Sequence, residues 1–173
     1  MEPDRQPMLE GALVTIRPTT PDDYRALYVV ASDPLLWEVH PAHDRWQEPR
    51  FRELFDTGLA SGGNVTIRDC ATGEVIGASR YDNWKPDADE IEIGWTYIAR
   101  AYWGGIYNRE IKALMLDHIH RFVATATFMV GEDNIRSRRA MEKIGGVLRD
   151  DIEVRTMAGV PVRHVTYAIR RSA

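Results

Sequence analysis

Three stretches rich in β-branched and aromatic residues follow one another with only short polar links between them. They read NVTIRD at 64–69, VIGASRYDNW at 75–84 and EIEIGWTYIA at 90–99, and the links CATGE and KPDAD contain residues typical of turns. Strands joined by links this short pair with their sequence neighbours in antiparallel fashion. The sequence therefore predicts an antiparallel meander over residues 64–99, and the rest of the chain has to be arranged around it.

Helices and further strands are predicted on both sides of the meander. A helix from about residue 108 to 122 carries its apolar residues at spacings of three and four. The remaining pattern predicts a strand at 11–18, helices at 19–32 and 48–61, a packed irregular loop at 33–48, a strand at 124–131, a short helix at 132–145 and a hairpin of strands at 147–156 and 162–170.

This order of elements predicts one α/β (α+β) domain. We expect a mixed, mostly antiparallel sheet of about seven strands flanked by helices, over residues 9–173. Residues 1–8 are polar and contain two prolines, so they are expected to form a loose lead-in.

The composition excludes several classes of protein. With 22 Lys and Arg against 26 Asp and Glu, the net charge of −4 leaves no general basic surface for nucleic acid. No apolar run reaches the roughly 18 residues of a membrane span, and the first residues lack the apolar core of a signal peptide. Cys70 is the single cysteine, so it cannot form an intramolecular disulfide. We therefore expect a cytoplasmic protein that binds neither nucleic acid nor membrane, with Cys70 as a structural residue.

A glycine pair lies where the meander passes into the following helix, in the stretch WGGIYN at 103–108. Exposed amides at a helix N-terminus can bind a phosphate through N–H groups and the positive end of the helix dipole. A glycine pair between strand and helix is equally compatible with a plain turn. Since no Gly-Lys-Ser/Thr follows, the stretch is not a P-loop.

A second motif, GEDNIRSRRAMEKIGG, follows the strand at 124–131. Asn134 suits an N-cap and Ser137 the first turn of a short helix, while the arginines suit a solvated face. Taken alone, the motif needs no ligand to explain it.

In their order, the meander, WGGIYN and EDNIRSRRAMEKIGG make the sequence resemble the GNAT superfamily of acyl-CoA-dependent N-acyltransferases. Within it, the sequence is similar to the branch of ribosomal-protein N-terminal and related acetyltransferases. The resemblance is specific over 90–119 and 130–152 and looser over 9–170. It implies acetyl-CoA as co-substrate, no metal, direct transfer to a primary amine, and a sheet that splays between the strands at 90–99 and 124–131.

The resemblance also implies a coenzyme site. The backbone near Ile98 would pair with the pantetheine arm, Asn134 would bond it, and the loop amides would hold the pyrophosphate. The implied coenzyme residues are Ile98, Arg100, Trp103, Gly104, Gly105, Ile106, Tyr107, Asn108, Asn134, Ser137, Arg138 and Arg139. Ile106 fills a slot that relatives give to glycine. Because its branched Cβ resists positive φ, we expect negative φ there or a distorted loop.

Acetyl transfer requires the amine in its neutral form, so a nearby carboxylate is expected to help. Alternation in EIEIGW predicts Glu90, Glu92 and Gly94 on one face, with Ile91, Ile93 and Trp95 on the other. Glu92 is the candidate proton acceptor, ranked before Glu90. An exposed carboxylate on a strand is the alternative.

The slot that holds a tyrosine acid in many relatives is Met141 here. A thiolate is a tolerable leaving group because thiols titrate near 8.5. Ser137 is therefore the candidate to assist the departing sulfur, with Tyr107 behind it.

Aromatic residues and histidines in the early loop are expected to roof the acceptor site. The candidate acceptor contacts are Trp37, His40, Trp46, Tyr81 and Trp84. Packing of the tryptophans as core is the alternative. His40 and His43 lack an obvious third ligand, so no metal is expected.

The expected partner is an amine acceptor, either a peptide N-terminus or a small molecule, and the protein is expected to be a monomer or homodimer. A non-catalytic CoA-binding or sensing module on the same fold is the main alternative function.

Overall fold

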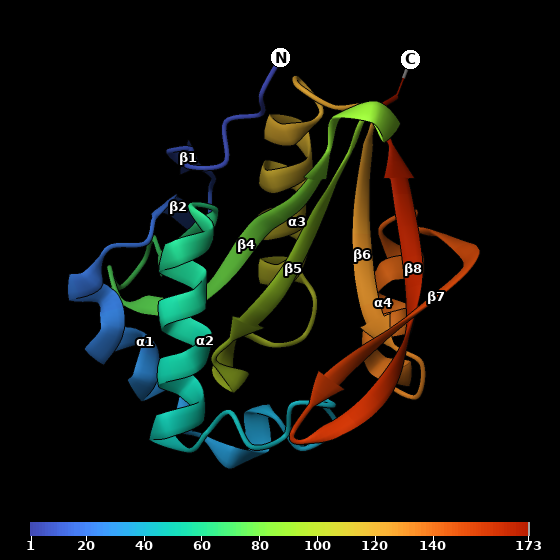
Figure 1. Cartoon of the computed structure of the whole chain (residues 1–173). Helices are drawn as coiled ribbons and strands as arrows, with labels where there is room; N and C mark the ends of the chain where they lie inside the picture. Colours follow the sequence, from blue (N-terminus) through green and yellow to red (C-terminus); the bar gives the residue numbers. More distant parts are fainter. Residues whose placement is uncertain (173) are drawn as a thin grey trace.

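A computed structural model describes residues 1–172 of the chain. Its centre is one sheet of eight strands in the order β1-β2-β3-β4-β5-β6-β8-β7 (Figure 1). The strands are β1 (Leu9–Glu10), β2 (Val14–Pro18), β3 (Asn64–Asp69), β4 (Val75–Lys85), β5 (Glu90–Ile98), β6 (Thr125–Gly131), β7 (Val147–Met157) and β8 (Val160–Arg170).

The predicted fold class is confirmed. β5 and β6 are parallel, and the other neighbouring strands are antiparallel. There are eight strands instead of about seven because Leu9–Glu10 forms a short extra edge strand against β2. The predicted first strand begins late, at Val14, because the Gly11 N–H bonds the Val14 carbonyl in a turn.

Helices cover both faces of this sheet. They are α1 (Tyr24–Ala31), α2 (Glu48–Ser61), α3 (Ile106–Ile119) and α4 (Ile135–Lys143), with short 3-10 helices at Pro21–Asp23, Pro34–Leu36, Pro86–Ala88 and Arg100–Tyr102.

Two apolar cores lie on the two faces. On one face, α1 and α2 pack around Trp37, Phe51 and Tyr97. On the other, Ile111 and Met115 of α3 pack against the sheet. The prediction for α3 was about two residues late at its start and three at its end, because Gly105 precedes the first helical residue and turns follow Ile119.

The meander of β3, β4 and β5 is confirmed, but its last strand contains an irregularity that alternation did not predict. The pairs Arg80↔Gly94 and Ala78↔Tyr97 leave one residue of β4 opposite two of β5, which is a β-bulge. Trp95 lies in this bulge with φ of 52°. Its ring contacts Arg155, the partner of Glu92, so Trp95 shares the face of Glu92. The expectation that Trp95 lies with Ile91 and Ile93 was wrong because the bulge reverses the alternation.

The parallel pair β5 and β6 is joined over only a few residues. Glu90, Ile91 and Glu92 pair with Thr125, Ala126 and Thr127, and beyond these positions the two strands separate. Figure 1 shows the resulting opening between β5 and β6. We call this opening the wedge.

Residues 1–8 contain no helix or strand, yet they are bonded to the domain. A ring nitrogen of His118 bonds the Asp4 carbonyl at 2.8 Å, and the Arg5 guanidinium donates to the Ser61 carbonyl at 3.0 Å. Within residues 1–172, no helix is long and apolar enough to cross a membrane.

Candidate active site

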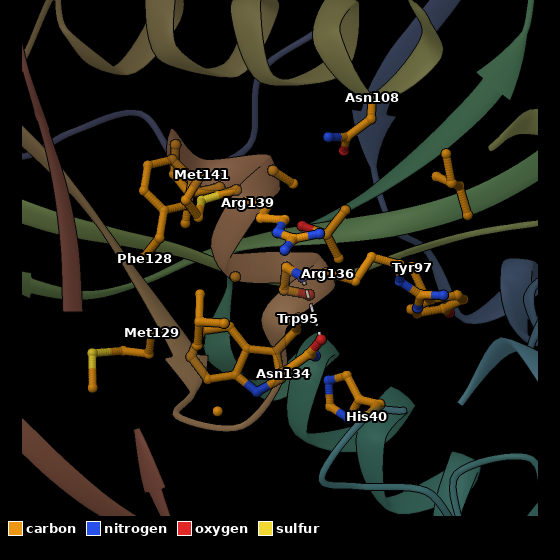
Figure 2. Close-up of a pocket in the computed structure, with 18 of the residues that line it drawn as sticks. His40, Trp95, Tyr97, Asn108, Phe128, Met129, Asn134, Arg136, Arg139 and Met141 are labelled. Carbon is orange, nitrogen blue, oxygen red and sulfur yellow. Dashed lines mark hydrogen bonds between the residues drawn. The ribbon is translucent and has the colours of Figure 1, made fainter. Parts of the chain in front are cut away.

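The wedge opens into a cavity of about 890 Å³. Both wedge strands line it, together with the loop that ends near Arg45, the turn before α3, the exposed face of α4, and the tip of β7. Figure 2 shows side chains of the early loop, β5, β6, α3 and α4 around one space. The structure thus brings the two sequence motifs together across the wedge.

The turn before α3 contains two residues in a conformation that favours glycine. Gly104 and Gly105 have φ of 114° and 110°, and a Cβ at either position would meet no atom within 4 Å. Ile106 does not have positive φ, and its side chain is 61% exposed outside the cavity. The two glycines therefore form the turn without straining Ile106, and open space lies in front of their amides.

The cavity lining is strongly basic although the whole chain is acidic. Its charged side chains include one carboxylate, Glu92, and the cations Arg45, Arg109, Lys112, Arg136, Arg139, Lys143 and Arg155. Arg136 lies over the Trp103 ring at 4.2 Å, so the two motifs touch at this point. Such a lining attracts a ligand with several negative charges.

The start of α4 presents the polar residues predicted for the coenzyme arm. Asn134 is buried, and its Oδ1 accepts the Ser137 N–H at 3.3 Å as an N-cap. Ser137 and Arg139 line the cavity. Arg138 does not, since it donates to the Tyr167 hydroxyl at 3.2 Å and the Glu132 carbonyl at 3.0 Å.

The other predicted coenzyme residues also divide into those that line the cavity and those that do not. Ile98, Trp103, Gly104, Gly105 and Asn108 line the cavity. The Trp103 indole N–H donates to the Ile98 carbonyl at 3.1 Å.

Arg100, Ile106 and Tyr107 lie outside the cavity lining. Arg100 donates to Asp33 at 2.5 Å and Tyr107 to Asp69 at 3.0 Å. The Arg100 and Tyr107 side chains are thus held outside the cavity by these two acids.

Glu92 faces the cavity but is enclosed by partners. It is 4% exposed, and its two oxygens accept from Arg155 at 3.0 and 2.9 Å and from Asn83 at 2.6 Å. Its side chain is therefore not the exposed carboxylate of the alternative interpretation. Glu90 is paired in the same manner with Arg149 and does not line the cavity.

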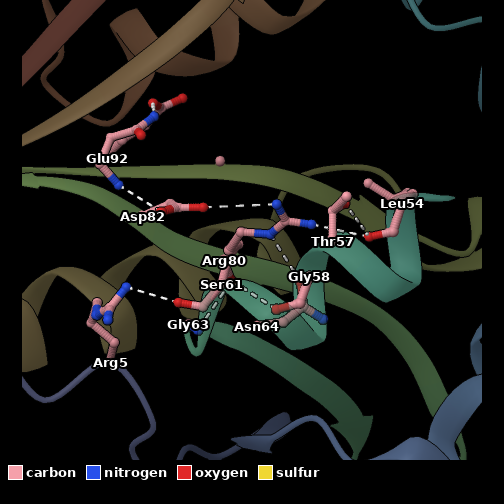
Figure 3. A network of polar contacts seen from close by, with 12 residues as sticks. Arg5, Leu54, Thr57, Gly58, Ser61, Gly63, Asn64, Arg80, Asp82 and Glu92 are labelled. Carbon is pink, nitrogen blue, oxygen red and sulfur yellow. Dashed lines mark hydrogen bonds and ion pairs between the residues drawn. The ribbon is translucent and has the colours of Figure 1, made fainter.

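The bulged Trp95 is held between two arginines. Its ring lies 4.6 Å from the Arg80 guanidinium and 5.7 Å from that of Arg155. Arg80 is itself fixed by Asp82 at 3.8 Å, the Leu54 carbonyl at 3.1 Å and Asn64 at 3.4 Å (Figure 3). A non-glycine residue with positive φ costs about 1–3 kcal/mol. This network stabilises the bulge against that cost.

The predicted acceptor residues occupy different environments. Trp37 and His40 line the cavity. The Trp37 indole N–H donates to the Ala31 carbonyl at 2.8 Å, which fixes the ring under the loop. Burial, aided by Arg45, lowers the pKa of His40 to about 3. His40 Nδ1 accepts the Ala42 N–H at 2.9 Å, so its proton is on Nε2.

Tyr81, Trp46 and Trp84 do not line this cavity. Tyr81 is wholly buried, with its hydroxyl donating to the Met115 carbonyl at 2.8 Å. This corrects the expectation of an acceptor contact at Tyr81, because its side chain has no surface to offer. Trp46 is 39% exposed, and Trp84 packs at the margin of the main core.

A second cavity of about 620 Å³ adjoins the first and shares Arg45, Trp95, Arg155 and Met157 with it. It lies between the start of α2 and the turn of the β7–β8 hairpin, with Thr57 and Gly159 in its lining. The two spaces meet at the bulge, so ligands approaching from the two sides would meet there. In the part of the chain that the structure describes, no cluster of three or more His, Cys, Asp or Glu side chains could hold a metal ion.

Several charged or titratable lining residues were absent from the predicted site, among them Lys112, Arg155 and His164. Lys112 is 4% exposed, donates to the Thr96 hydroxyl at 2.7 Å, and has its pKa lowered by burial to about 8. The only signal in the sequence was its position directly after Ile111 in an otherwise apolar stretch. Arg155 and His164 lie on strands whose curvature over the wedge no local pattern encodes.

Comparison with known proteins agrees with this geometry. The family profile described as acetyltransferase (GNAT) domain matches residues 14–147. A comparison with curated protein sequences finds no match. Among solved structures, a GCN5-related N-acetyltransferase from Brucella melitensis superposes with a TM-score of 0.83 at 19% identity, covering 97% of this chain and 80% of that one.

Two further structures share the fold. The spermidine N-acetyltransferase from Vibrio cholerae, in complex with CoA and spermine, has a TM-score of 0.69 at 15% identity, covering 92% of this chain and 96% of that one. A proposed ribosomal-protein-serine acetyltransferase from Vibrio cholerae has a TM-score of 0.72 at 15% identity, covering 99% of this chain and 100% of that one. Because the family match runs from β2 to the start of β7 and includes both wedge strands, the chain belongs to the GNAT superfamily and is an acetyltransferase that uses acetyl-CoA.

Proposed function

We propose that the protein transfers an acetyl group directly from acetyl-CoA in the wedge to a primary amine that arrives through the second cavity. The basic lining of the wedge, in a chain of net charge −4, is the observation that carries this proposal. Coenzyme A carries several phosphate charges, which this lining would neutralise. The amine acceptor is either a small molecule or a peptide N-terminus.

The coenzyme would lie along β5 with its phosphates at the start of α3. Amides of residues 104–108 would bind the pyrophosphate, since Gly104 and Gly105 leave open space there. Arg136 lies over Trp103 next to this turn and Arg139 lines the same cavity, so both would supply charge to the coenzyme. The Ile98 backbone and the Asn134 side chain would hold the arm in the wedge.

The bound coenzyme supplies an acetyl thioester, which an amine can attack. The chain's own contribution is to place that amine and to manage protons. We propose that the Glu92 carboxylate, the one acid in the larger cavity's lining, attracts the ammonium form of the acceptor. Ser137 lines the same space, and its hydroxyl would donate to the departing sulfur.

The acceptor side differs from the coenzyme side in its charge pairing. In the second cavity, Arg50 pairs with Asp44 and Glu53, and Arg155 pairs with Glu153. These acids are thus neutralised by neighbours. Relatives named for spermidine and for ribosomal protein suggest the two acceptor classes to test.

Purified protein mixed with acetyl-CoA and a panel of peptides, polyamines and small amines should release free thiol. No release with any amine would contradict the proposed function. CoA binding by calorimetry without turnover would instead indicate a CoA-binding or sensing module.

Charge variants separate the coenzyme side from general effects. Arg136→Gln and Arg139→Gln should each weaken CoA binding several-fold, because each removes a charge from the cavity lining. Arg25→Gln is the matched control, since Arg25 is exposed on α1 outside both cavities. Equal effects of all three variants would refute the assignment of the phosphates to this side.

A further inference from the structure

We propose that His164 is the proton acceptor for the amine in this reaction. The inference rests on the proposed function and adds to it a catalytic residue on β8, the strand next to the far side of the wedge. It stands on the tautomer of the His164 ring, on the direction of its free nitrogen and on the face of the sheet where it lies.

The tautomer of His164 is fixed by its own strand. Its Nδ1 lies 3.0 Å from the Val162 carbonyl oxygen. A carbonyl oxygen can only accept, so Nδ1 must carry the proton. In the neutral ring Nε2 then has a free lone pair, which is the form that a general base requires.

This lone pair faces the cavity. Within residues 1–172, every fully enclosed side-chain nitrogen or oxygen has a hydrogen-bond partner. His164 Nε2 has no such partner, so it is not fully enclosed, although His164 as a whole is 3% exposed. Since His164 lines the larger cavity, the accessible surface of Nε2 would open into that cavity.

The ring lies on the acceptor side of the sheet. Val165 and Tyr167 belong to the core under α3, so His164 and Thr166 point to the opposite face. Thr166 contacts Met129, which lines the cavity and is drawn there in Figure 2. This is the face from which the second cavity leads to the bulge.

Charged and titratable groups surround His164, but together with burial they leave its ring neutral. Arg155 and Glu153 face it from β7, Glu92 from β5 and His40 from the early loop. Burial, reinforced by Arg155, lowers the pKa of His164 below its ordinary value. The ring is therefore neutral at neutral pH, when a base is needed. Glu92 is less suited to the step because Arg155 and Asn83 already bond its oxygens.

The step balances without any further reactant. The amine nitrogen bonds the acetyl carbon, His164 Nε2 takes one proton from that nitrogen, and the C–S bond breaks. The departing sulfur takes a proton from the Ser137 hydroxyl, which takes one back from solvent, so the products are an amide and a free thiol. His164 then returns its proton to solvent.

The test combines a spectrum with a pH profile. Nitrogen NMR of the intact protein should show His164 neutral at pH 7 with the proton on Nδ1. With the amine found by the thiol-release screen, wild-type kcat/KM should fall at acidic pH around the pKa that NMR assigns to His164. His164→Asn should lower kcat/KM about 100-fold or more and lose that acidic limb, while calorimetric CoA binding stays unchanged.

His120→Asn is the control, because a ring nitrogen of His120 also bonds a backbone carbonyl, that of Ile169, and the residue lies outside both cavities. A proton on Nε2 at pH 7, an acidic limb that His164→Asn retains, or a loss no larger than that of His120→Asn would overturn the proposal. If wild-type protein releases no thiol with any amine, the proposed function itself has failed, and this role fails with it.

Discussion

Charged side chains are buried against both faces of β5, and two of them, Glu92 of β5 and Lys112 of α3, differ in how their charge is compensated. On the α2 face, Glu92 is 4% exposed and is bonded by Arg155 through two hydrogen bonds and by Asn83 through one. On the α3 face, Lys112 is also 4% exposed, but the Thr96 hydroxyl is its hydrogen-bond partner and no carboxylate pairs with it within residues 1–172. A compensated charge, Glu92, and an uncompensated charge, Lys112 of α3, thus lie on opposite sides of the same strand.

The compensated pair has a structural consequence. Arg155 is on β7, which is separated from β5 by β6 and β8 in the sheet order. Arg149 of β7 pairs with Glu90 in the same manner. The Arg155–Glu92 pair therefore joins β7 to β5 at the residue where β5 and β6 begin to separate, and the Arg149–Glu90 pair joins them where β5 and β6 are still paired. In Figure 1, β7 crosses β8. The uncompensated Lys112 bridges nothing and keeps donors available to the cavity.

The largest effect is expected from breaking the compensated pair. Arg155→Met leaves the Glu92 carboxylate buried without its cation, so the free energy of unfolding should fall by about 3–5 kcal/mol. Urea unfolding at pH 7 measures this loss. The matched control is Arg163→Met, which breaks an ion pair to Glu132 whose two side chains are 60% and 36% exposed. That change should cost only about 0–1 kcal/mol. Equal losses in the two variants would show that burial does not distinguish the pairs.

Removing the uncompensated charge of Lys112 should change the free energy of unfolding in the opposite direction. Burial lowers the pKa of Lys112 from 10.5 to about 8, so the folded state pays to keep this lysine charged at pH 7. Lys112→Met should therefore raise the free energy of unfolding, by an amount on the order of 3 kcal/mol at most. The comparison requires urea unfolding of both proteins at several pH values.

The pH dependence of that difference has a fixed direction. Below about pH 8 the folded and unfolded states both hold the Lys112 proton, so the penalty is constant. Between about pH 8 and 10.5 only the unfolded state retains it, so the wild-type free energy of unfolding gains on the variant as pH rises. A difference between the two proteins that does not shrink over this range would contradict the burial argument.

This contrast also marks where sequence-based prediction succeeds and fails. The meander, the hairpin and the order of helices follow from local periodicity and turn residues, which the sequence displays directly. WGGIYN and EDNIRS were read as one site only through a resemblance, because nothing local says that two motifs meet across a wedge. Arg136 over Trp103 is the contact that joins them.

The bulge and the buried charges could not be read in this way. Trp95 has positive φ, which its residue type disfavours, and it is held there by arginines from β4 and β7. In the sequence, Lys112 has the pattern of an exposed lysine on an amphipathic helix, and only the packing of α3 against the sheet buries it. Glu92 was predicted as a proton acceptor and lines the cavity, but its partner Arg155 lies 63 positions away. Long-range packing decides each of these features.

A smaller effect is expected from removing the single partner of Lys112. Thr96→Val deletes the hydroxyl that accepts from Lys112 and bonds Ser79 at 2.8 Å, while keeping the side-chain shape. The loss of stability should be about 1–3 kcal/mol, the usual cost of leaving a buried donor unpaired. In the Lys112→Met background the same change should cost less. A double-mutant cycle by urea unfolding measures this coupling, and purely additive effects would mean that Thr96 does not stabilise the ammonium.

The smallest effect is expected from removing the uncharged partner of Glu92. Asn83 donates to Glu92 at 2.6 Å and has φ of 49°, a conformation that glycine adopts without cost. Asn83→Gly therefore loses one hydrogen bond but relieves backbone strain, and Arg155 still compensates the carboxylate. The free energy of unfolding should change by less than about 1 kcal/mol. Asn83→Ala loses the bond without relieving φ, so it should be the more destabilised of the two in the same urea experiment. If both variants lose as much stability as Arg155→Met, the Asn83 amide compensates Glu92 as much as the Arg155 cation does. The difference between Glu92 and Lys112 would then lie in the number of hydrogen bonds and not in charge pairing.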